Sequence, residues 1–251
     1  MKALLLAAGR GSRLGALTGD CPKPMLPVGG LPILEHAVRL LARHGFDDLV
    51  INLHYRPERI RAHFGDGRGW GVRIAYSLET ELQGTAGAAR RVAAWLDRTF
   101  LVYYGDNLTN FDLTDLWQAH RRLRAAATLG LLWMDEPTTR GIVGLAADGR
   151  VERFLEKPTA DQVFPGYLVN AGVYVLEPAV LRHVPGTGPN DFGQDVFPRL
   201  LADGEGLYGH RLQGQLYSTD TPERYAEACR AVDSGRFALP EAWPARGEDR
   251  A

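Results

Sequence analysis

The first candidate site in this sequence is a glycine-containing segment that follows an apolar run near the N-terminus. Residues 3–6 read Ala-Leu-Leu-Leu, which is typical of a buried parallel strand, and residues 7–13 read Ala-Ala-Gly-Arg-Gly-Ser-Arg. Small residues let backbone N–H groups approach a ligand closely, and the two arginines add positive charge that suits phosphates. Ten residues after Arg13, two prolines stiffen the backbone around Lys23. These residues together predict a bound polyphosphate.

The glycine pattern by itself fits more than one kind of loop. A dinucleotide-binding loop needs a third small residue where Leu14 stands, and an acid about 20 residues on, whereas residues 49–54 end without one. A P-loop needs Gly-Lys-Ser/Thr, which this segment does not contain. The glycine pattern alone is equally compatible with an ordinary turn between a strand and a helix, without a ligand.

The whole of residues 4–27 resembles the signature of sugar-1-phosphate nucleotidyltransferases, Leu-Ala-Ala-Gly-x-Gly-x-Arg-Leu followed by Pro-Lys-Pro-Met-Leu-Pro. Ala16 stands where that family usually has proline. Leu82 and Gln83 replace the Pro-Leu of the family's Glu-x-x-Pro-Leu-Gly-Thr-Ala-Gly segment. The resemblance covers roughly residues 1 to 232 and continues in family order through 79–87, 104–106, 141–143, 156–158, 170–172 and 191–193.

Composition limits the classes of protein that this chain can belong to. Its 251 residues are 45% hydrophobic and 24% charged, which suits one α/β domain with a proper core. A net charge of −1 argues against a nucleic-acid partner, and we expect neither a signal peptide nor a membrane span. The two cysteines form no metal-binding pattern, so we expect free thiols in a cytoplasmic protein.

Alternating strand and helix patterns predict the elements that hold these residues. The expected fold is α/β: a doubly wound, mainly parallel, Rossmann-like sheet flanked by helices, with a small β-rich part in the second half. The resemblance implies that this β-rich part binds the sugar. Ligands bind such sheets at the carboxyl ends of the strands, where the first loop, Gln83-Gly84 and Asp106 fall. The expected strands are 3–6, 48–54, 72–77, 100–104, 127–134, 144–147, 150–155, 168–176, 208–212 and 216–217, and the helices are 32–44, 57–64, 85–96, 113–124, 195–202 and 222–232.

The sequence predicts a single domain with two functional halves. Residues 1–238 form the expected nucleotidyltransferase domain, divided into a nucleotide-binding half (1–135) and a sugar-phosphate-binding half (136–238). Residues 239–251, rich in proline, alanine, arginine and acids, are expected to be a flexible tail.

The resemblance implies a specific reaction. A phosphate oxygen of a sugar 1-phosphate attacks the α-phosphorus of a nucleoside triphosphate, and pyrophosphate leaves. That nucleophile is already ionised, so the reaction needs alignment and charge neutralisation rather than a general base. By resemblance, the catalytic residues are Arg13, Lys23, Asp106 and Lys157. The nucleotide-binding residues are Leu6, Ala7, Ala8, Gly9, Gly11, Ser12, Arg13, Gln83, Gly84 and Thr85, and the sugar-phosphate-binding residues are Gly141, Glu156, Lys157 and Asn170.

The implied cofactor is Mg²⁺, a hard cation that prefers carboxylate and phosphate oxygens. Asp106, at the end of an apolar strand, is the first expected ligand. The family commonly places a second aspartate where this chain has Ser218, and an acid appears two residues later at Asp220. Asp220 is therefore the second expected ligand, with capping of the last helix as its alternative. Asn170 has a comparable alternative role in a turn.

The resemblance also bears on the choice of nucleotide and sugar. The Gly-Thr-Ala-Gly form resembles guanylyltransferases and favours GTP with a mannose- or heptose-like 1-phosphate, whereas the amide of Gln83 could pair a pyrimidine. Uridylyl, thymidylyl or adenylyl transfer to another sugar or cyclitol phosphate stays open, as does cytidylyl transfer to a phospho-alcohol. A nucleotide-sugar sensor is the non-enzyme alternative. The expected partners are the two substrates, without nucleic acid or membrane, and the oligomeric state is open.

Overall fold

The computed structural model describes residues 1–186 and 188–238, and the chain forms two compact units. Unit 1 contains Met1–Leu82, Tyr104–Phe111 and the segment that starts at Gly214, and unit 2 contains Gln83–Tyr103 and Asp112–Gln213. The predicted tail at 239–251 lies outside the described residues. The expected division into nucleotide and sugar halves stays a prediction.

Unit 1 is built on three parallel strands in the order β1 (Lys2–Leu6), β4 (Asp48–Leu53) and β5 (Arg73–Leu78). The apolar residues of β4 and residues 3–5 of β1 are buried, as expected for parallel strands covered by helices, whereas β5 buries Ile74 and leaves Leu78 exposed. The register pairs Leu6 with Asn52 and Asn52 with Ser77, so the polar ends of the strands lie side by side. Helices α1 (Ile33–Arg43) and α2 (Pro57–Phe64) and the short pair β2 (Pro27–Val28) and β3 (Leu31–Pro32) connect them.

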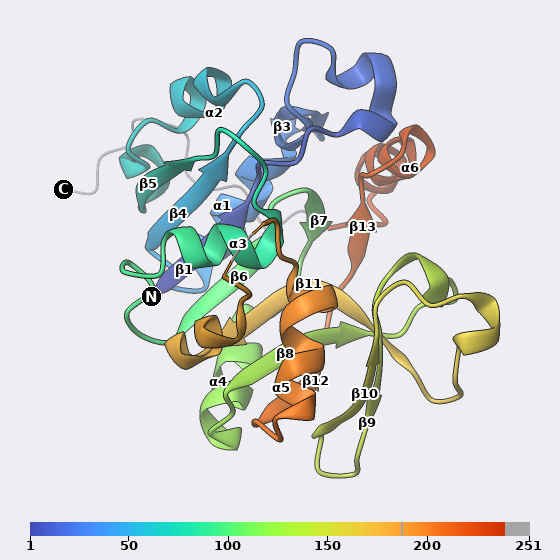
Figure 1. The fold of residues 1–251 in the computed structure, drawn as a ribbon. Coiled ribbons are helices and arrows are strands. Elements are labelled where there is room, and N and C mark those ends of the chain that lie inside the picture. Colours follow the sequence, from blue (N-terminus) through green and yellow to red (C-terminus); the bar gives the residue numbers. More distant parts are fainter. Residues whose placement is uncertain (187, 239–251) are drawn as a thin grey trace. The chain divides into compact units, whose positions relative to one another are not determined.

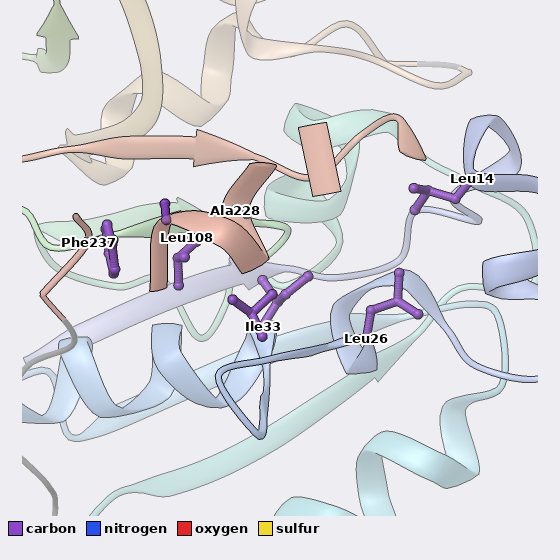
Figure 2. Packing of buried hydrophobic residues seen from close by; sticks show 8 residues of the cluster. Leu14, Leu26, Ile33, Leu108, Ala228 and Phe237 are labelled. Carbon is purple, nitrogen blue, oxygen red and sulfur yellow. The ribbon is translucent and has the colours of Figure 1, made fainter. Parts of the chain in front are cut away.

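A second part of unit 1 brings a late segment of the chain to the N-terminal loops. Strand β13 (Leu216–Ser218) pairs antiparallel with β7 (Asn107–Thr109), and helix α6 (Pro222–Asp233) follows. Helix α6 packs against the short helix η1 (Ser12–Thr18) and strand β2, and the short helix η2 (Lys23–Met25) packs against α1. Figure 2 shows Leu14, Leu26 and Ala228 from these segments in one cluster. This packing fixes the segments that carry Arg13 and Lys23. The apolar cluster between them consists of Leu14, Leu26, Val28, Ile33, Leu108, Ala228, Ala231 and Phe237.

Unit 2 is organised around the nine-residue buried strand β11 (Leu168–Leu176), which is antiparallel to each of its neighbours β6, β8 and β9 (Figure 1). Strand β12 is parallel to β8, and β9 and β10 form a hairpin. The remaining bounds are α3 (Gly84–Arg91), β6 (Phe100–Tyr104), α4 (Leu113–Leu123), β8 (Ala127–Leu132), β9 (Ile142–Leu145), β10 (Val151–Leu155), α5 (Phe197–Ala202) and β12 (Leu207–Arg211).

The predicted α/β, Rossmann-like class is confirmed, with parallel strands in unit 1 and a mixed arrangement around β11 in unit 2. The helix expected at 85–96 ends at Arg91, because residues 92–95 continue as turns. The helix expected at 195–202 is α-helical only from Phe197, and a π-helical turn, η7 (Phe192–Val196), precedes it. Single π-helical turns often occur at functional sites. None of the helices in 1–186 and 188–238 has the length and apolar character needed to cross a membrane.

Candidate active site

The predicted phosphate loop of unit 1 requires glycine at Gly11. This residue has a φ of +68°, and a Cβ there would lie 2.8 Å from Cβ of Lys23. Glycine therefore allows both the left-handed backbone and the close approach of the lysine segment. The carbonyl of Gly11 accepts hydrogen bonds from the backbone N–H of Leu14 at 2.9 Å and from Oγ1 of Thr18 at 3.2 Å.

Lys23 and Asp106 form an ion pair, with 2.6 Å between Nζ and Oδ2. The lysine side chain is 6% exposed, whereas the aspartate side chain is 36% exposed. A buried ammonium is stable only when it is paired, so Asp106 fixes the position of the lysine nitrogen. The pair brings two of the predicted catalytic residues together in unit 1, and their catalytic roles stay predictions.

The backbone around Asp106 is held by the β7–β13 pairing. Oγ1 of the fully buried Thr219 donates a 2.8 Å hydrogen bond to the carbonyl of Asp106, and the N–H of Gly105 bonds to the carbonyl of Leu6. Thr219 was not among the predicted site residues. Its signal in the sequence is weak, since a threonine directly after a short strand is common.

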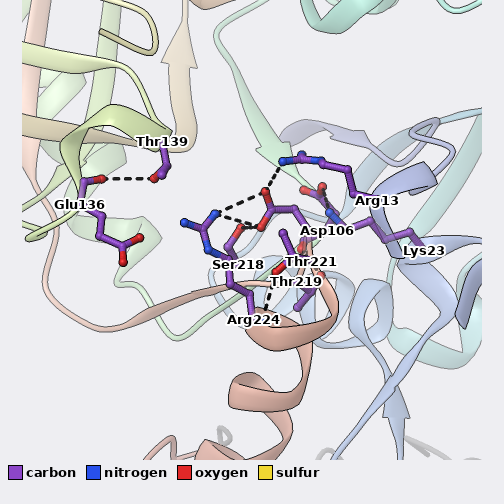
Figure 3. A network of polar contacts seen from close by, with 10 residues as sticks. Arg13, Lys23, Asp106, Glu136, Thr139, Ser218, Thr219, Thr221 and Arg224 are labelled. Atoms are coloured by element: carbon purple, nitrogen blue, oxygen red, sulfur yellow. Dashed lines mark hydrogen bonds and ion pairs between the residues drawn. The ribbon is translucent and has the colours of Figure 1, made fainter. Parts of the chain in front are cut away.

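Arg13 also lies close to a carboxylate. Its Nη1 is 2.8 Å from Oδ2 of Asp220, and Nη1 of Arg224 is 3.2 Å from the Oδ1 atom (Figure 3). Oγ of Ser218 donates to the same Oδ1 at 3.0 Å. Burial alone would raise the pKa of Asp220, but hydrogen bonds from Arg224 and Ser218 and the nearby guanidinium charges hold the pKa below its usual value.

A buried polar network supports the start of the loop. The side-chain oxygen of Asn52 accepts from the N–H of Ala7 at 2.7 Å, and its amide nitrogen donates to Oε1 of Glu79 at 2.8 Å. Because the N–H of Ala7 is used in this hydrogen bond, the carbonyl is the backbone group of Ala7 that can bind a ligand. His54 receives a 3.2 Å hydrogen bond from Nε of Arg10 and bonds to the carbonyl of Glu79. Asn52 and His54 were not among the site residues predicted from the sequence. The sequence feature that could have indicated them is a polar residue within an otherwise apolar strand.

In unit 2, the predicted nucleotide residues Gln83, Gly84 and Thr85 are bonded to the segment 190–192. A Cβ at Gly84, where φ is +73°, would lie 2.4 Å from the carbonyl oxygen of Asn190. The N–H of Asn190 donates to the carbonyl of Gln83. Asp191 accepts from both the N–H and the Oγ1 of Thr85, at 3.1 and 2.9 Å. These contacts fix the loop at the start of α3.

The predicted sugar residue Glu156 faces two glycines of unit 2. A Cβ at either Gly141 or Gly193 would lie 2.6 Å from its Oε2 atom. The carboxylate has no hydrogen-bond or ion-pair partner within 1–186 and 188–238. Burial raises the pKa of Glu156, and the charge of Lys157 opposes this only in part. A hydrogen-bond acceptor of this kind, beside two glycines that leave space next to it, is suited to bind hydroxyl groups.

The other predicted sugar residues lie beside Glu156. The N–H of Asn170 donates to the carbonyl of Gly141 at 2.8 Å. Its side chain donates to the hydroxyl of Tyr174 and accepts from the N–H of Gly172. Asn170 lies within strand β11, at a point where the register shifts, and not in the turn that was its alternative role. Lys157 has an exposed side chain and a φ of +46°, a backbone conformation that is unfavourable for a non-glycine residue.

The two aspartates expected to bind Mg²⁺ differ in how well they fit a cation. Asp106 fits, because its carboxylate is partly exposed and only its Oδ2 atom is used by Lys23. Asp220 fits poorly, because guanidinium groups and a hydroxyl already contact both of its oxygens. The described parts of the chain contain no group of three or more His, Cys, Asp or Glu side chains arranged to hold a metal.

Residues 2–243 match the sequence model of the family described as Nucleotidyl transferase, and the chain belongs to this family. A mannose-1-phosphate guanylyltransferase of Mycobacterium tuberculosis is 36% identical over 251 residues, which cover 98% of this chain and 68% of the relative. A UTP–glucose-1-phosphate uridylyltransferase of Synechocystis sp. is 32% identical over 246 residues, which cover 92% of this chain and 63% of the relative. The chain thus spans about two thirds of the length of these relatives.

Solved structures support the fold. A putative glucose-1-phosphate thymidylyltransferase from Bacillus anthracis superposes with a TM-score of 0.84 at 23% identity, covering 92% of this chain and 95% of that one. A UDP-glucose pyrophosphorylase superposes with a TM-score of 0.80 at 19% identity. At these identities the likeness concerns the fold alone.

Proposed function

We propose that this protein is a sugar-1-phosphate nucleotidyltransferase that joins a sugar 1-phosphate to a nucleoside triphosphate and releases pyrophosphate. The observation that carries the proposal is the Lys23–Asp106 ion pair directly beside Gly11. It gives a fixed positive charge next to a glycine loop suited to phosphates, and an adjacent carboxylate suited to a cation. Family membership supports the same reaction class.

In this mechanism, the backbone of Ala8, Gly9 and Ser12 holds the triphosphate, with Leu6 and Ala7 at the base. Arg13 balances the charge that develops on pyrophosphate as the bond between the α-phosphorus and the bridging oxygen breaks. Lys23 aligns the attacking and attacked phosphates, and Lys157 binds the sugar phosphate. Asp106 would hold Mg²⁺, which would supply charge neutralisation on the phosphates. All these roles follow from alignment and electrostatics, without a general base.

The proposed nucleotide is GTP, and the proposed sugar is a mannose- or heptose-like 1-phosphate. Guanylyltransferases among the relatives at 34–36% identity support this choice, and the uridylyltransferase at 32% makes UTP the alternative. The unpartnered acceptor of Glu156 between Gly141 and Gly193 supports a ligand with hydroxyl groups. Two free cysteines support a reducing, cytoplasmic location.

The test is pyrophosphate release with Mg²⁺ across ATP, CTP, GTP, UTP and dTTP, each with a panel of sugar 1-phosphates and with phosphocholine. We expect release that requires both GTP and one sugar phosphate, and that is lost in Asp106→Ala. Release with CTP and phosphocholine would identify the cytidylyltransferase instead. Binding of a nucleotide sugar without release from any pair would identify a sensor.

A further inference from the structure

Asp220 is held by two arginines in a way that points to a role other than metal binding. Its Oδ2 atom lies 2.8 Å from Arg13 and 3.4 Å from Arg224, and its Oδ1 atom lies 3.2 Å from Arg224 and 3.0 Å from Oγ of Ser218. The carboxylate is 15% exposed, so these contacts account for most of its surroundings. Each oxygen thus already has two polar neighbours.

A metal ion at this carboxylate would meet unfavourable charge. Two guanidiniums within 3.5 Å of the oxygens would repel a divalent cation, and burial strengthens that repulsion. Arginine keeps its proton under all ordinary conditions, so this charge cannot be removed by titration. The two arginines and one aspartate instead leave one net positive charge, which attracts a polyphosphate.

The ion pair with Asp220 restricts the conformation of the Arg13 side chain. Its side chain is 69% exposed, and Asp220 is the one carboxylate that pairs with it in the described residues. A long exposed arginine loses rotamer freedom when it binds a phosphate, and holding it in advance reduces that loss. Asp220 in turn is fixed by Arg224 from helix α6, whose N-terminus is capped by Thr221 (Figure 3).

We propose that Asp220 is a positioning residue for Arg13, with Arg224 as its anchor, and that it does not bind the metal. The inference rests on the proposed function, because it gives Arg13 the pyrophosphate end of a triphosphate as its ligand. It also accounts for the departure from the family pattern, since the hydroxyl of Ser218, in the usual aspartate position, now donates to Asp220.

A double-mutant cycle tests the inference. The probe is inorganic tripolyphosphate without metal, and its dissociation constant is measured calorimetrically for wild type, Arg13→Ala, Asp220→Asn and the double variant. We expect Asp220→Asn to weaken binding about 5- to 10-fold in the wild-type background. In the Arg13→Ala background it should not weaken binding, because a positioning residue acts through Arg13 and because removal of a negative charge by itself favours an anionic ligand. Equal losses in both backgrounds, or no loss in wild type, would overturn the proposal.

A second measurement addresses the metal directly. Free Mn²⁺ is followed by electron paramagnetic resonance during titration of each variant, without substrate and without turnover. We expect Asp220→Asn to bind Mn²⁺ within about 2-fold of wild type, and Asp106→Asn to bind it much more weakly. Weaker Mn²⁺ binding in Asp220→Asn than in wild type would identify Asp220 as a ligand and overturn the proposal.

Two further variants complete the design. Asp20→Asn removes a carboxylate from the exposed Asp20–Arg56 pair and controls for the loss of one charge in the same unit. Arg224→Gln should weaken tripolyphosphate binding in the same direction as Asp220→Asn, and it keeps the inference testable if that variant does not fold. If wild type neither binds tripolyphosphate nor releases pyrophosphate in the substrate panel, the proposed function fails, and the inference fails with it.

Discussion

Lys23 and Asp106 lie 83 positions apart in the sequence and form a 2.6 Å ion pair in which the amine is buried and the carboxylate is partly exposed. The asymmetry means that the lysine is fixed by the fold, whereas Asp106 keeps an oxygen for a ligand. A single pair thus connects the η2 segment to the turn between β6 and β7.

Removal of the Lys23 charge is expected to abolish catalysis without unfolding the protein. Lys23→Met should lower kcat by roughly 100- to 1,000-fold, since a fixed charge on the reacting phosphates acts most strongly in the transition state. Steady-state kinetics of pyrophosphate release measures this, with Arg68→Met, from an exposed Arg68–Asp66 pair, as the control. A variant that changed only KM would contradict a catalytic role for Lys23.

Gly11 is expected to be required for the position of Lys23. In Gly11→Ala, the new Cβ would meet Cβ of Lys23 at 2.8 Å in a left-handed backbone, so kcat should fall at least about 10-fold and stability by about 1 kcal/mol. Kinetics and urea unfolding measure both effects. Gly69→Ala is the control, because nothing lies within 4 Å of its Cβ position and its φ is not positive. Equal effects in both variants would refute the steric explanation.

Gly193 is expected to control sugar binding. A methyl group there would lie 2.6 Å from Oε2 of Glu156 and would displace the carboxylate. Gly193→Ala should therefore raise the KM for the sugar 1-phosphate about 10-fold and leave the KM for the triphosphate within about 2-fold. Gly186→Ala, with open space at its Cβ, is the matched control. An equal rise in both KM values would show that Glu156 does not act on the sugar alone.

Glu156 is expected to limit stability at neutral pH. Burial raises its pKa above the unfolded value, so its ionisation opposes folding, and stability is lost as the pH rises through the folded pKa. Glu156→Gln should be more stable than wild type by roughly 1 kcal/mol near neutral pH and equal to it in acid, while its KM for the sugar 1-phosphate rises. Urea unfolding across pH and sugar kinetics test this. Lower stability at neutral pH would contradict it.

Ionised Glu35 is expected to stabilise unit 1 at neutral pH, whereas ionised Glu156 is expected to destabilise the fold there. Burial raises its pKa, but hydrogen bonds from Arg39 and His63 outweigh burial and leave the pKa below its usual value. The stabilisation is therefore present above the unfolded pKa of about 4.3 and is lost as the pH falls through the folded pKa.

The corresponding variant is Glu35→Gln, which leaves the arginine without a buried counter-charge. It should lower the free energy of unfolding by about 3 kcal/mol near neutral pH, and the difference should shrink in acid. Urea unfolding across the pH range measures it, with the exposed Glu58→Gln as control. A difference that is constant with pH would exclude an ionic origin.

The sequence by itself predicted the glycine-containing loop after β1 and the order of the longer strands and helices, because apolar periodicity and glycine spacing are local properties of the chain. It did not predict the short strands β2, β3 and β7, whose pairing depends on distant segments or on a tight turn. It did not determine that β11 runs antiparallel to β6, β8 and β9, since strand direction depends on pairing between distant segments. Nor did it determine what Asp220 contacts. A shift of two residues leaves a carboxylate on the same face of an extended segment. Arg224 is only four residues from Asp220 in the sequence, whereas Arg13 reaches Asp220 only because α6 packs against η1.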